Sequence, residues 1–277
     1  MTHLSLASIA LAAVANLTYL PQVNANAHQN LRQTKNVNSS NAEENTQAFD
    51  FFVLSMSFQP EFCHAHKRDG YAGCEDPQEF WRGSLTLHGL WPENNDGSWP
   101  STCTNEKFNP KTVSDLGPDR FDKLWPNVKS SESSRDHTSF WDHEWTKHGT
   151  CTGLAQDDYF DTAMKHFLPT PTIVRDNYGA TVATSDLIAA YRADLADEYG
   201  DVVLVCSGGR YLSEVRVCVA KNKDGSGSHR IECIPQVAGE GNCGSEITIA
   251  KFYIDEEDEV ALVTEEEEEE MMDVKVE

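Results

Sequence analysis

Residues 140–151 hold a dense group of side chains that could carry out chemistry. Their sequence is FWDHEWTKHGTC, and its reactive groups are His143, Glu144, Lys147 and His148. Successive residues of an α-helix are rotated by about 100°, so Glu144 stacks with His148 one turn away. His143 stacks with Lys147 in the same way, and all four fit within an arc of about 140°. The pattern predicts one reactive helix face. A solvated charged face is the alternative, although aromatic residues frame the four side chains.

Another histidine, His88, lies in the segment LTLHGLWP of residues 85–92. It ends an apolar run that favours a strand, and glycine, tryptophan and proline follow it. We therefore expect His88 where a rigid sheet gives way to an open loop, which is where functional side chains concentrate. Taken alone, a buried histidine that only supports the fold is the preferred interpretation.

These residue types match the needs of phosphodiester cleavage without a metal ion. The reaction requires a base for the attacking hydroxyl, an acid for the leaving oxygen, and cations that hold the phosphate. Histidine suits both proton transfers, and Lys147 supplies positive charge. A zinc-protease motif is excluded because its histidines are four residues apart, whereas His143 and His148 are five apart. A zinc site between Cys63 and Cys74 is disfavoured because the paired spacings typical of zinc are missing. We predict no metal and no cofactor.

The two histidine segments resemble the paired active-site motifs of the RNase T2 family, HGLWP and HExxKHGxC. The resemblance is highly specific and covers about Phe49 to Ile254, including FQPEFC at residues 58–63 and the cysteine-containing stretch 206–243. By motif position it implies that His148 is the general base and His88 the general acid. It also implies a group that binds phosphate and stabilises the transition state, formed by His143, Glu144 and Lys147.

The segment WPENNDGSW, residues 91–99, resembles the main base-binding loop of that family. Trp91, Glu93 and Trp99 occupy the positions of its stacking and base-contacting residues. Bases of single-stranded RNA stack on aromatic rings, and a carboxylate can accept a hydrogen bond from a base amino group. Core packing is the alternative role for the two tryptophans. Ser57 stands where plant members commonly carry glutamine, which puts the base preference in doubt.

The chain has eight cysteines, an even number that indicates disulfides formed in an oxidising compartment. Their number alone allows many pairings. The family framework implies the pairs Cys63–Cys74, Cys103–Cys151, Cys206–Cys243 and Cys218–Cys233. The second of these would tie the loop after the first motif to the end of the catalytic helix.

The order of elements favours an α+β fold with helices packed on a central antiparallel sheet. Strands are predicted at residues 49–58, 84–90, 202–206, 211–220 and 247–254. A hairpin at residues 207–210, SGGR, joins the third strand to the fourth. Helices are predicted at residues 139–148, 157–167 and 185–199, with Gly149 and Gly200 ending the first and the last.

The 277 residues leave room for one sizeable domain with appendages. We expect a signal peptide at 1–27, with an A-x-A pattern before the cleavage point, and a polar disordered linker at 28–48 that carries the glycosylation sequon of Asn38. The catalytic domain spans 49–254. Thirteen acidic residues and one lysine predict a disordered tail at 255–277. The net charge of −23 argues against tight binding along a long polyanion, so a local positive cluster must suffice.

We therefore predict a monomeric endoribonuclease, secreted or held in a lytic compartment, that converts single-stranded RNA to fragments with 2′,3′-cyclic phosphate ends. DNA is excluded as a substrate because it lacks the 2′-hydroxyl, and no membrane helix is expected. One alternative is a secreted RNA-binding protein with the same fold and no turnover. Another is a metal-dependent phosphodiesterase, for which no carboxylate cluster stands out before the tail.

Overall fold

Strand β1 (Phe51–Ser57) begins close to the start of the part of the chain that the computed structural model describes, which comprises residues 49–130, 138–194 and 201–255. Several predictions fall outside these residues. They are the signal peptide (1–27), the linker (28–48), the helix end at Gly200 and the acidic tail beyond Asp255.

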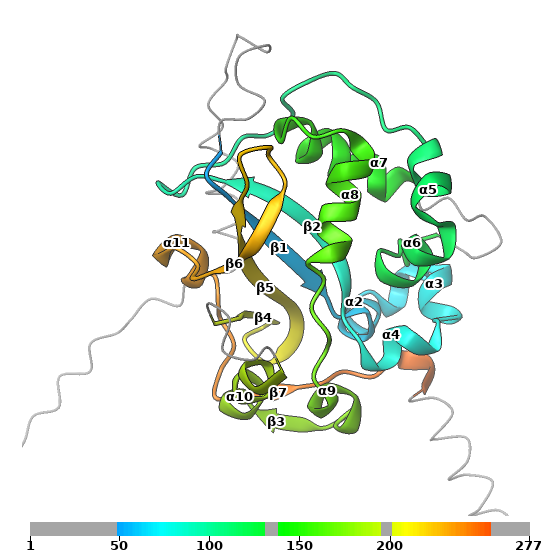
Figure 1. Ribbon diagram of the computed structural model, residues 1–277. Helices are drawn as coiled ribbons and strands as arrows, with labels where there is room; N and C mark the ends of the chain where they lie inside the picture. The colour runs from blue at the N-terminus through cyan, green and yellow to red at the C-terminus, as the bar shows by residue number, and fades with distance from the viewer. Residues whose placement is uncertain (1–48, 131–137, 195–200, 256–277) are drawn as a thin grey trace, which may run out of the picture. The chain divides into compact units, whose positions relative to one another are not determined.

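The described strands form one sheet in the order β2-β1-β5-β7-β3, with β4 and β6 also paired to β5 (Figure 1). The further strands are β2 (Thr86–Glu93), β3 (Thr181–Ala183), β4 (Val203–Ser207), β5 (Tyr211–Lys221), β6 (Gly227–Ile231) and β7 (Glu246–Thr248). All pairings are antiparallel except that of β5 with β7, which is parallel. The predicted α+β fold is confirmed, and its sheet is mixed instead of purely antiparallel.

Strand β1 lies between β2 and β5 and is buried on both faces. Successive side chains of a strand point to opposite faces of its sheet. Phe52, Leu54 and Met56 accordingly pack in the main hydrophobic core, whereas Phe51 and Val53 pack in a second, smaller cluster. Strand β1 therefore contributes side chains to the hydrophobic clusters on both faces of the sheet.

Strand β2 is longer than predicted, because its pairing with β1 continues to Glu93. His88 lies inside the strand, and the prediction of an open loop directly after it is wrong. Pro92 is tolerated because β2 is at the edge of the described sheet, where one N–H is not needed for pairing. Ser55 pairs with Gly89 and the next residue of β1 pairs with Leu87, so His88 is the extra residue of a β-bulge. Such bulges re-aim side chains.

Helices surround the sheet. They are α2 (Gln59–Ala65), α3 (Ala72–Glu75), α4 (Glu79–Gly83), α5 (Lys111–Leu116), α6 (Pro118–Leu124), α7 (Thr138–Lys147), α8 (Gln156–Lys165), α9 (Thr172–Asp176), α10 (Thr184–Asp194) and α11 (Pro235–Ala238), with 3-10 turns η1 (Lys67–Asp69) and η2 (Gly149–Cys151). Helices α7 and α8 confirm two predictions, and α10 confirms a third as far as it is described. The sequence did not predict α2 to α6, because four to seven residues are too few to show a helical period.

Helix α8 lies beside β2 (Figure 1), and Glu144 of α7 accepts a hydrogen bond from Trp91 of β2. Trp145 of α7 and Tyr159 of α8 pack edge to face, with ring centroids 5.7 Å apart, in the same core as Leu90 of β2. The Tyr159 hydroxyl donates a hydrogen bond of 2.9 Å to the Leu90 carbonyl. Both histidine segments are therefore anchored in one core.

The predicted hairpin is confirmed by β4 and β5, which are joined by three residues, Gly208, Gly209 and Arg210. These glycines have φ angles of 57° and 73°, in the left-handed region that residues with a side chain rarely adopt. They are the central residues of a turn that the Arg210 amide closes by donating to the Ser207 carbonyl at 3.1 Å, and two positive φ angles in such a turn match the twist of antiparallel strands.

The final strand is shorter than predicted. β7 ends at Thr248, and the following residues leave the sheet because Phe252 and Tyr253 pack in a third cluster beside Cys63 and Cys74. Asp255, the first residue of the predicted tail, belongs to the folded domain. Its carboxylate accepts hydrogen bonds from Arg82 at 3.1 Å and from the Tyr178 hydroxyl at 2.6 Å.

All four predicted disulfides are present, namely Cys63–Cys74, Cys103–Cys151, Cys206–Cys243 and Cys218–Cys233. The pairing of Cys63 with Cys74 leaves no thiolate there for zinc. Among the described residues, no helix has the length and apolar character needed to cross a membrane.

Candidate active site

Helix α7 carries its reactive side chains in two adjacent rows. Glu144 and His148 form the inner row, with only 1% and 7% of their surfaces exposed. His143 and Lys147 form the outer row and are exposed. The helix ends at Lys147, yet the His148 amide still donates to the Glu144 carbonyl at 3.0 Å, which keeps the inner row in register. The predicted convergence on one side of the helix is thus present, and its two rows differ in exposure.

Glu144 is a buried carboxyl group directed at the first motif. It accepts a hydrogen bond of 3.1 Å from the Trp91 indole nitrogen. Burial raises its pKa from the ordinary value of 4.5 to about 7, against the opposing effects of His88, the Trp91 hydrogen bond and Lys147. This carboxyl group therefore changes its charge near neutral pH.

Gly89 is required where the two motifs meet. A Cβ atom at this position would lie 2.1 Å from Glu144 Oε2 and 2.2 Å from Trp91 Nε1, so any side chain would separate the two groups. Because Gly89 has no side chain, the backbone of β2 can lie directly beside the hydrogen bond between Trp91 and Glu144.

His88 is held from two sides. Its Nδ1 lies 2.6 Å from Oε1 of Glu214, on β5, and its backbone carbonyl accepts a 3.0 Å hydrogen bond from the indole of Trp125. Burial lowers the pKa of His88, but Glu214 and then Glu144 raise it, and the net pKa is above the ordinary value. His88 is therefore disposed to carry a proton.

Trp91 contacts both candidate catalytic imidazoles. Its ring centroid lies 5.1 Å from that of His88, nearly perpendicular, and 5.5 Å from that of His148, at an interplanar angle of 30°. Phe140 of α7 packs against His88 at 5.9 Å. The structure thus brings His88 and His148, which are far apart in sequence, to the same tryptophan.

His143, in the outer row, is affected by its cationic neighbours. Burial lowers its pKa, and Lys147 and His88 lower it further. Its pKa therefore shifts in the opposite direction to that of His88. A cation next to this row disfavours a second positive charge.

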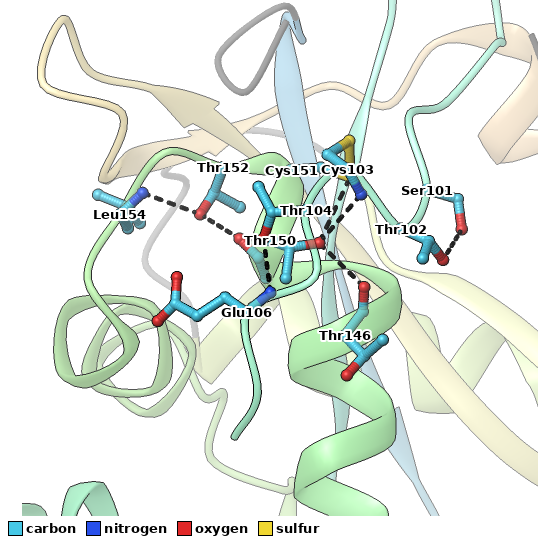
Figure 2. Close-up of a disulfide and its surroundings, with 11 residues drawn as sticks. Ser101, Thr102, Cys103, Thr104, Glu106, Thr146, Thr150, Cys151, Thr152 and Leu154 are labelled. Carbon is cyan, nitrogen blue, oxygen red and sulfur yellow. Dashed lines mark hydrogen bonds between the residues drawn. A yellow bond between two sulfur atoms is a disulfide. The ribbon is translucent and has the colours of Figure 1, made fainter. Parts of the chain in front are cut away.

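The disulfide Cys103–Cys151 connects the end of α7 to the loop that follows the first motif. Figure 2 shows the Thr150 hydroxyl between Cys103 and Thr146, where it accepts from the Cys103 amide at 3.1 Å and donates to the Thr146 carbonyl at 2.9 Å. The Thr102 amide also donates to the Lys147 carbonyl, at 3.0 Å. Covalent and hydrogen bonds together fix this loop against α7 and the turn that follows it, as the predicted pairing implied.

The residues assigned to base binding differ in exposure. Trp91 and Glu93 are buried, at 8% and 2%, whereas Trp99 is half-buried beyond the turn that follows β2. Trp91 also packs in the second hydrophobic cluster, as the core-packing alternative expects, and its ring lies 5.2 Å from the Arg216 guanidinium. The base-binding roles stay predictions.

Sequence reasoning missed Glu214 and Arg216 of β5. Both are largely buried, with 12% and 15% of their side chains exposed. A signal was present, because Glu214 and Arg216 alternate with Val215 and Val217 in the middle strand of the sheet. Charged residues are rarely buried unless they are paired, so a charged alternation in such a strand indicates an internal ion pair. Within the described residues, no group of three or more histidines, cysteines and acids could hold a metal ion.

Comparisons with known proteins agree with this architecture. The model of the Ribonuclease T2 family matches residues 49–233. Intracellular ribonuclease LX of Solanum lycopersicum is 32% identical over 217 residues, covering 75% of this chain and 86% of the relative. Extracellular ribonuclease LE of the same species is 32% identical over 218 residues, covering 74% and 88%. The crystal structure of RNase NT in complex with 5′-AMP superposes with a TM-score of 0.56 at 26% identity, covering 74% of this chain and 100% of that one.

Proposed function

Since the chain belongs to the Ribonuclease T2 family, it is an endoribonuclease, and we propose that it cleaves single-stranded RNA by transesterification to 2′,3′-cyclic phosphate ends. The observation that carries this proposal is the packing of His88 and His148 against one indole ring, with a buried carboxyl group and an exposed lysine beside them. Two imidazoles at one site supply the base and the acid that the reaction needs.

In the proposed reaction, neutral His148 accepts the proton of the 2′-hydroxyl as its oxygen attacks the phosphorus. Protonated His88 donates its proton to the departing 5′-oxygen as the P–O bond breaks. The two histidines then hold the opposite protonation states, and proton exchange with solvent restores them. The raised pKa of His88 supports its assignment as the acid.

The outer row of α7 and the buried Glu144 are assigned to the phosphate. Both side chains of the outer row are exposed: Lys147 presents positive charge beside the inner row, as stabilisation of a pentacoordinate phosphate requires, and His143, whose pKa is lowered, offers an imidazole N–H as a hydrogen-bond donor. Glu144 donates a hydrogen bond to a phosphate oxygen while its carboxyl group is protonated, which its pKa of about 7 permits at mildly acid pH.

Base recognition is assigned to the region that follows His88. By motif position Trp99 is assigned to stacking and Glu93 to accepting a hydrogen bond from a base, and Trp91 lines the site between the histidines. DNA is not a substrate, because the attacking 2′-hydroxyl is absent from it.

We propose that the protein acts as a secreted monomer without a cofactor. Removal of residues 1–27 as a signal peptide, glycosylation at Asn38 and an acidic tail that chemistry does not need complete this organisation. Four disulfides support an oxidising compartment. The two tomato relatives are named intracellular and extracellular, so their names favour neither destination.

The decisive test is cleavage of a defined single-stranded oligoribonucleotide in EDTA by wild type, His88→Ala and His148→Ala. We expect wild type to release cyclic phosphate ends, and each variant to lose at least about 100-fold in rate, the size of one general acid-base contribution. An oligonucleotide with 2′-deoxy sugars should remain intact. Binding of RNA without cleavage by wild type would favour the recognition protein instead, and activity only with added metal would favour the metal-dependent phosphodiesterase.

A further inference from the structure

Behind His88, on the middle strands of the sheet, lies a charged network that the family motifs do not include. Glu214 is on β5, which is separated from β2 by β1. Ser55 of β1 pairs with Gly89 on one side and with Arg216 on the other. Because Ser55 and Ser57, the β1 residues opposite Arg216 and Glu214, carry small side chains, the charged residues of β5 have room to extend across β1 toward β2.

We propose that Glu214 is a positioning residue of the active site, which holds the His88 imidazole by Nδ1 so that its protonated Nε2 faces the substrate. This inference rests on the proposed role of His88 as general acid. An ionised carboxylate can only accept hydrogen bonds, so Nδ1 must be the donor across the 2.6 Å contact. The remaining ring nitrogen, Nε2, is then the one that carries the transferable proton.

Arg216 fixes the carboxylate that holds His88. Its Nε donates to Glu214 Oε2 at 2.9 Å, while Oε1 is occupied by His88, so each oxygen of Glu214 has its own partner. Another nitrogen of Arg216 donates to Glu240, and its guanidinium lies 5.2 Å from the Trp91 ring centroid. These contacts fix the orientation of the Glu214 carboxylate between His88 and Arg216.

The charges in this network balance only when His88 is protonated. Two carboxylates and one guanidinium leave one negative charge, which an imidazolium neutralises. Glu214, Arg216 and Glu240 each expose 15% or less of their side chains, and buried charges are tolerated when they are paired in this way. The network therefore favours the acid form of His88.

The charged and titratable groups around His88 come from two elements besides its own strand. Glu214 favours the protonated form from β5, and Glu144 favours it from α7, whereas Arg216 and His143 oppose it. Trp91 and Phe140 add apolar contact without charge. Glu214 makes the direct contact and outweighs Glu144, so it is the residue whose removal should change His88 most.

The test replaces Glu214 by Gln in the full chain, which keeps the shape of the side chain and removes its charge. In labelled protein, the NMR titration of His88, assigned by its loss in His88→Gln, should move to a lower pKa. The falling limb of the kcat/KM profile, which reports the free enzyme's acid, should move to lower pH with it. We expect kcat to fall by about 10- to 100-fold and KM for RNA to change little, because Glu214 does not contact the phosphate. A merely structural role would leave both titrations in place.

Asp161→Asn is the matched control, because Asp161 of α8 is also a carboxylate paired with an arginine, Arg120, at 2.9 Å. It should leave the His88 titration and the rate profile unchanged. Glu214→Asp keeps the charge and should retain part of the rise in the His88 pKa. If Glu214→Gln does not fold, the His88 titration is measured in Glu214→Asp instead. An unchanged His88 titration in the folded variant overturns the proposal. If the NMR titration of His88 shifts but the pH profile of kcat/KM does not, His88 is not the general acid of the proposed reaction. Failure of the positioning role and failure of the proposed function therefore give different results.

Discussion

Two buried glutamates from different elements act on His88, and their surroundings give them opposite properties. Glu144, on α7, has a neutral indole N–H as its hydrogen-bond donor, and burial raises its pKa to about 7. Burial also acts on Glu214, on β5, but Arg216 and His88 outweigh it and hold its pKa well below the ordinary value. Glu214 therefore stays an anion, whereas Glu144 changes charge near neutral pH.

The difference teaches that the partners of a buried carboxyl group, more than its depth, decide its role. A fixed anion can hold an imidazolium in place, whereas a carboxyl group that titrates near neutrality can donate or accept a proton or a hydrogen bond. Burial acts to raise the pKa of both glutamates, so burial alone does not separate them.

The largest expected effect comes from breaking the contact that holds Glu144. Gly89→Ala places a methyl group where Glu144 Oε2 and Trp91 Nε1 lie, at 2.1 and 2.2 Å from the ideal Cβ position, and so separates them. We expect the rate of RNA cleavage to fall by about 100-fold or more, because displacements of about 1 Å have effects of that size. The free energy of unfolding should fall by about 1–3 kcal/mol, as for other overpacked sites.

Gly208→Ala is the control for this variant. Its new methyl group meets no atom within 4 Å, but its φ of +57° costs about 1–2 kcal/mol for a residue with a side chain. It should lower stability and leave activity unchanged. A Gly89→Ala protein that folds and cleaves RNA like Gly208→Ala would show that the Trp91–Glu144 contact is not needed.

Opposite dependences of stability on pH should follow from the two glutamates. Glu144 has a raised pKa in the folded state, so its protonation stabilises the fold at low pH, and this stability is lost as pH rises from 4.5 to about 7. Glu214 has a lowered pKa, so it stabilises the fold above pH 4.5, and this stability is lost as pH falls toward its folded pKa.

Denaturant unfolding at pH 5 and pH 8 checks these signs. Glu144→Gln, which is always neutral, should gain stability relative to wild type between pH 5 and pH 8, by up to about 3 kcal/mol, since one pKa unit corresponds to about 1.4 kcal/mol. Glu214→Gln should lose stability at both pH values. Equal pH dependence of wild type and Glu144→Gln would mean that Glu144 is ionised throughout.

The same comparison marks what the sequence can predict. Glu144 was predicted because it stands in a short helical motif with His143, Lys147 and His148, where spacing alone fixes which side chains share a face. Glu214 was missed because its contact to His88 joins residues 126 positions apart across an intervening strand. Register and bulges create such contacts, and local periodicity does not encode them.

A similar limit applies to the fold. The buried strand at β1, the glycine turn between β4 and β5, and helices α7 and α8 follow from local patterns. The continuation of β2 past His88 depends on pairing with β1, and the early end of β7 depends on Phe252 and Tyr253 packing elsewhere. In both cases tertiary packing overrides the local signal.

The smallest effect concerns the outer row, where the charged neighbour that shifts the pKa of a histidine is a cation and not a carboxylate. Burial lowers the pKa of His143, and Lys147 lowers it further. Lys147→Met should therefore raise the His143 pKa in an NMR titration. Lys165→Met is the matched control, because Lys165 lowers the pKa of His166 in a similar way; it should raise the His166 pKa and leave His143 unchanged. An unchanged His143 titration in Lys147→Met would show that the two side chains are not electrostatically coupled. Their contributions to phosphate binding would then be independent of each other.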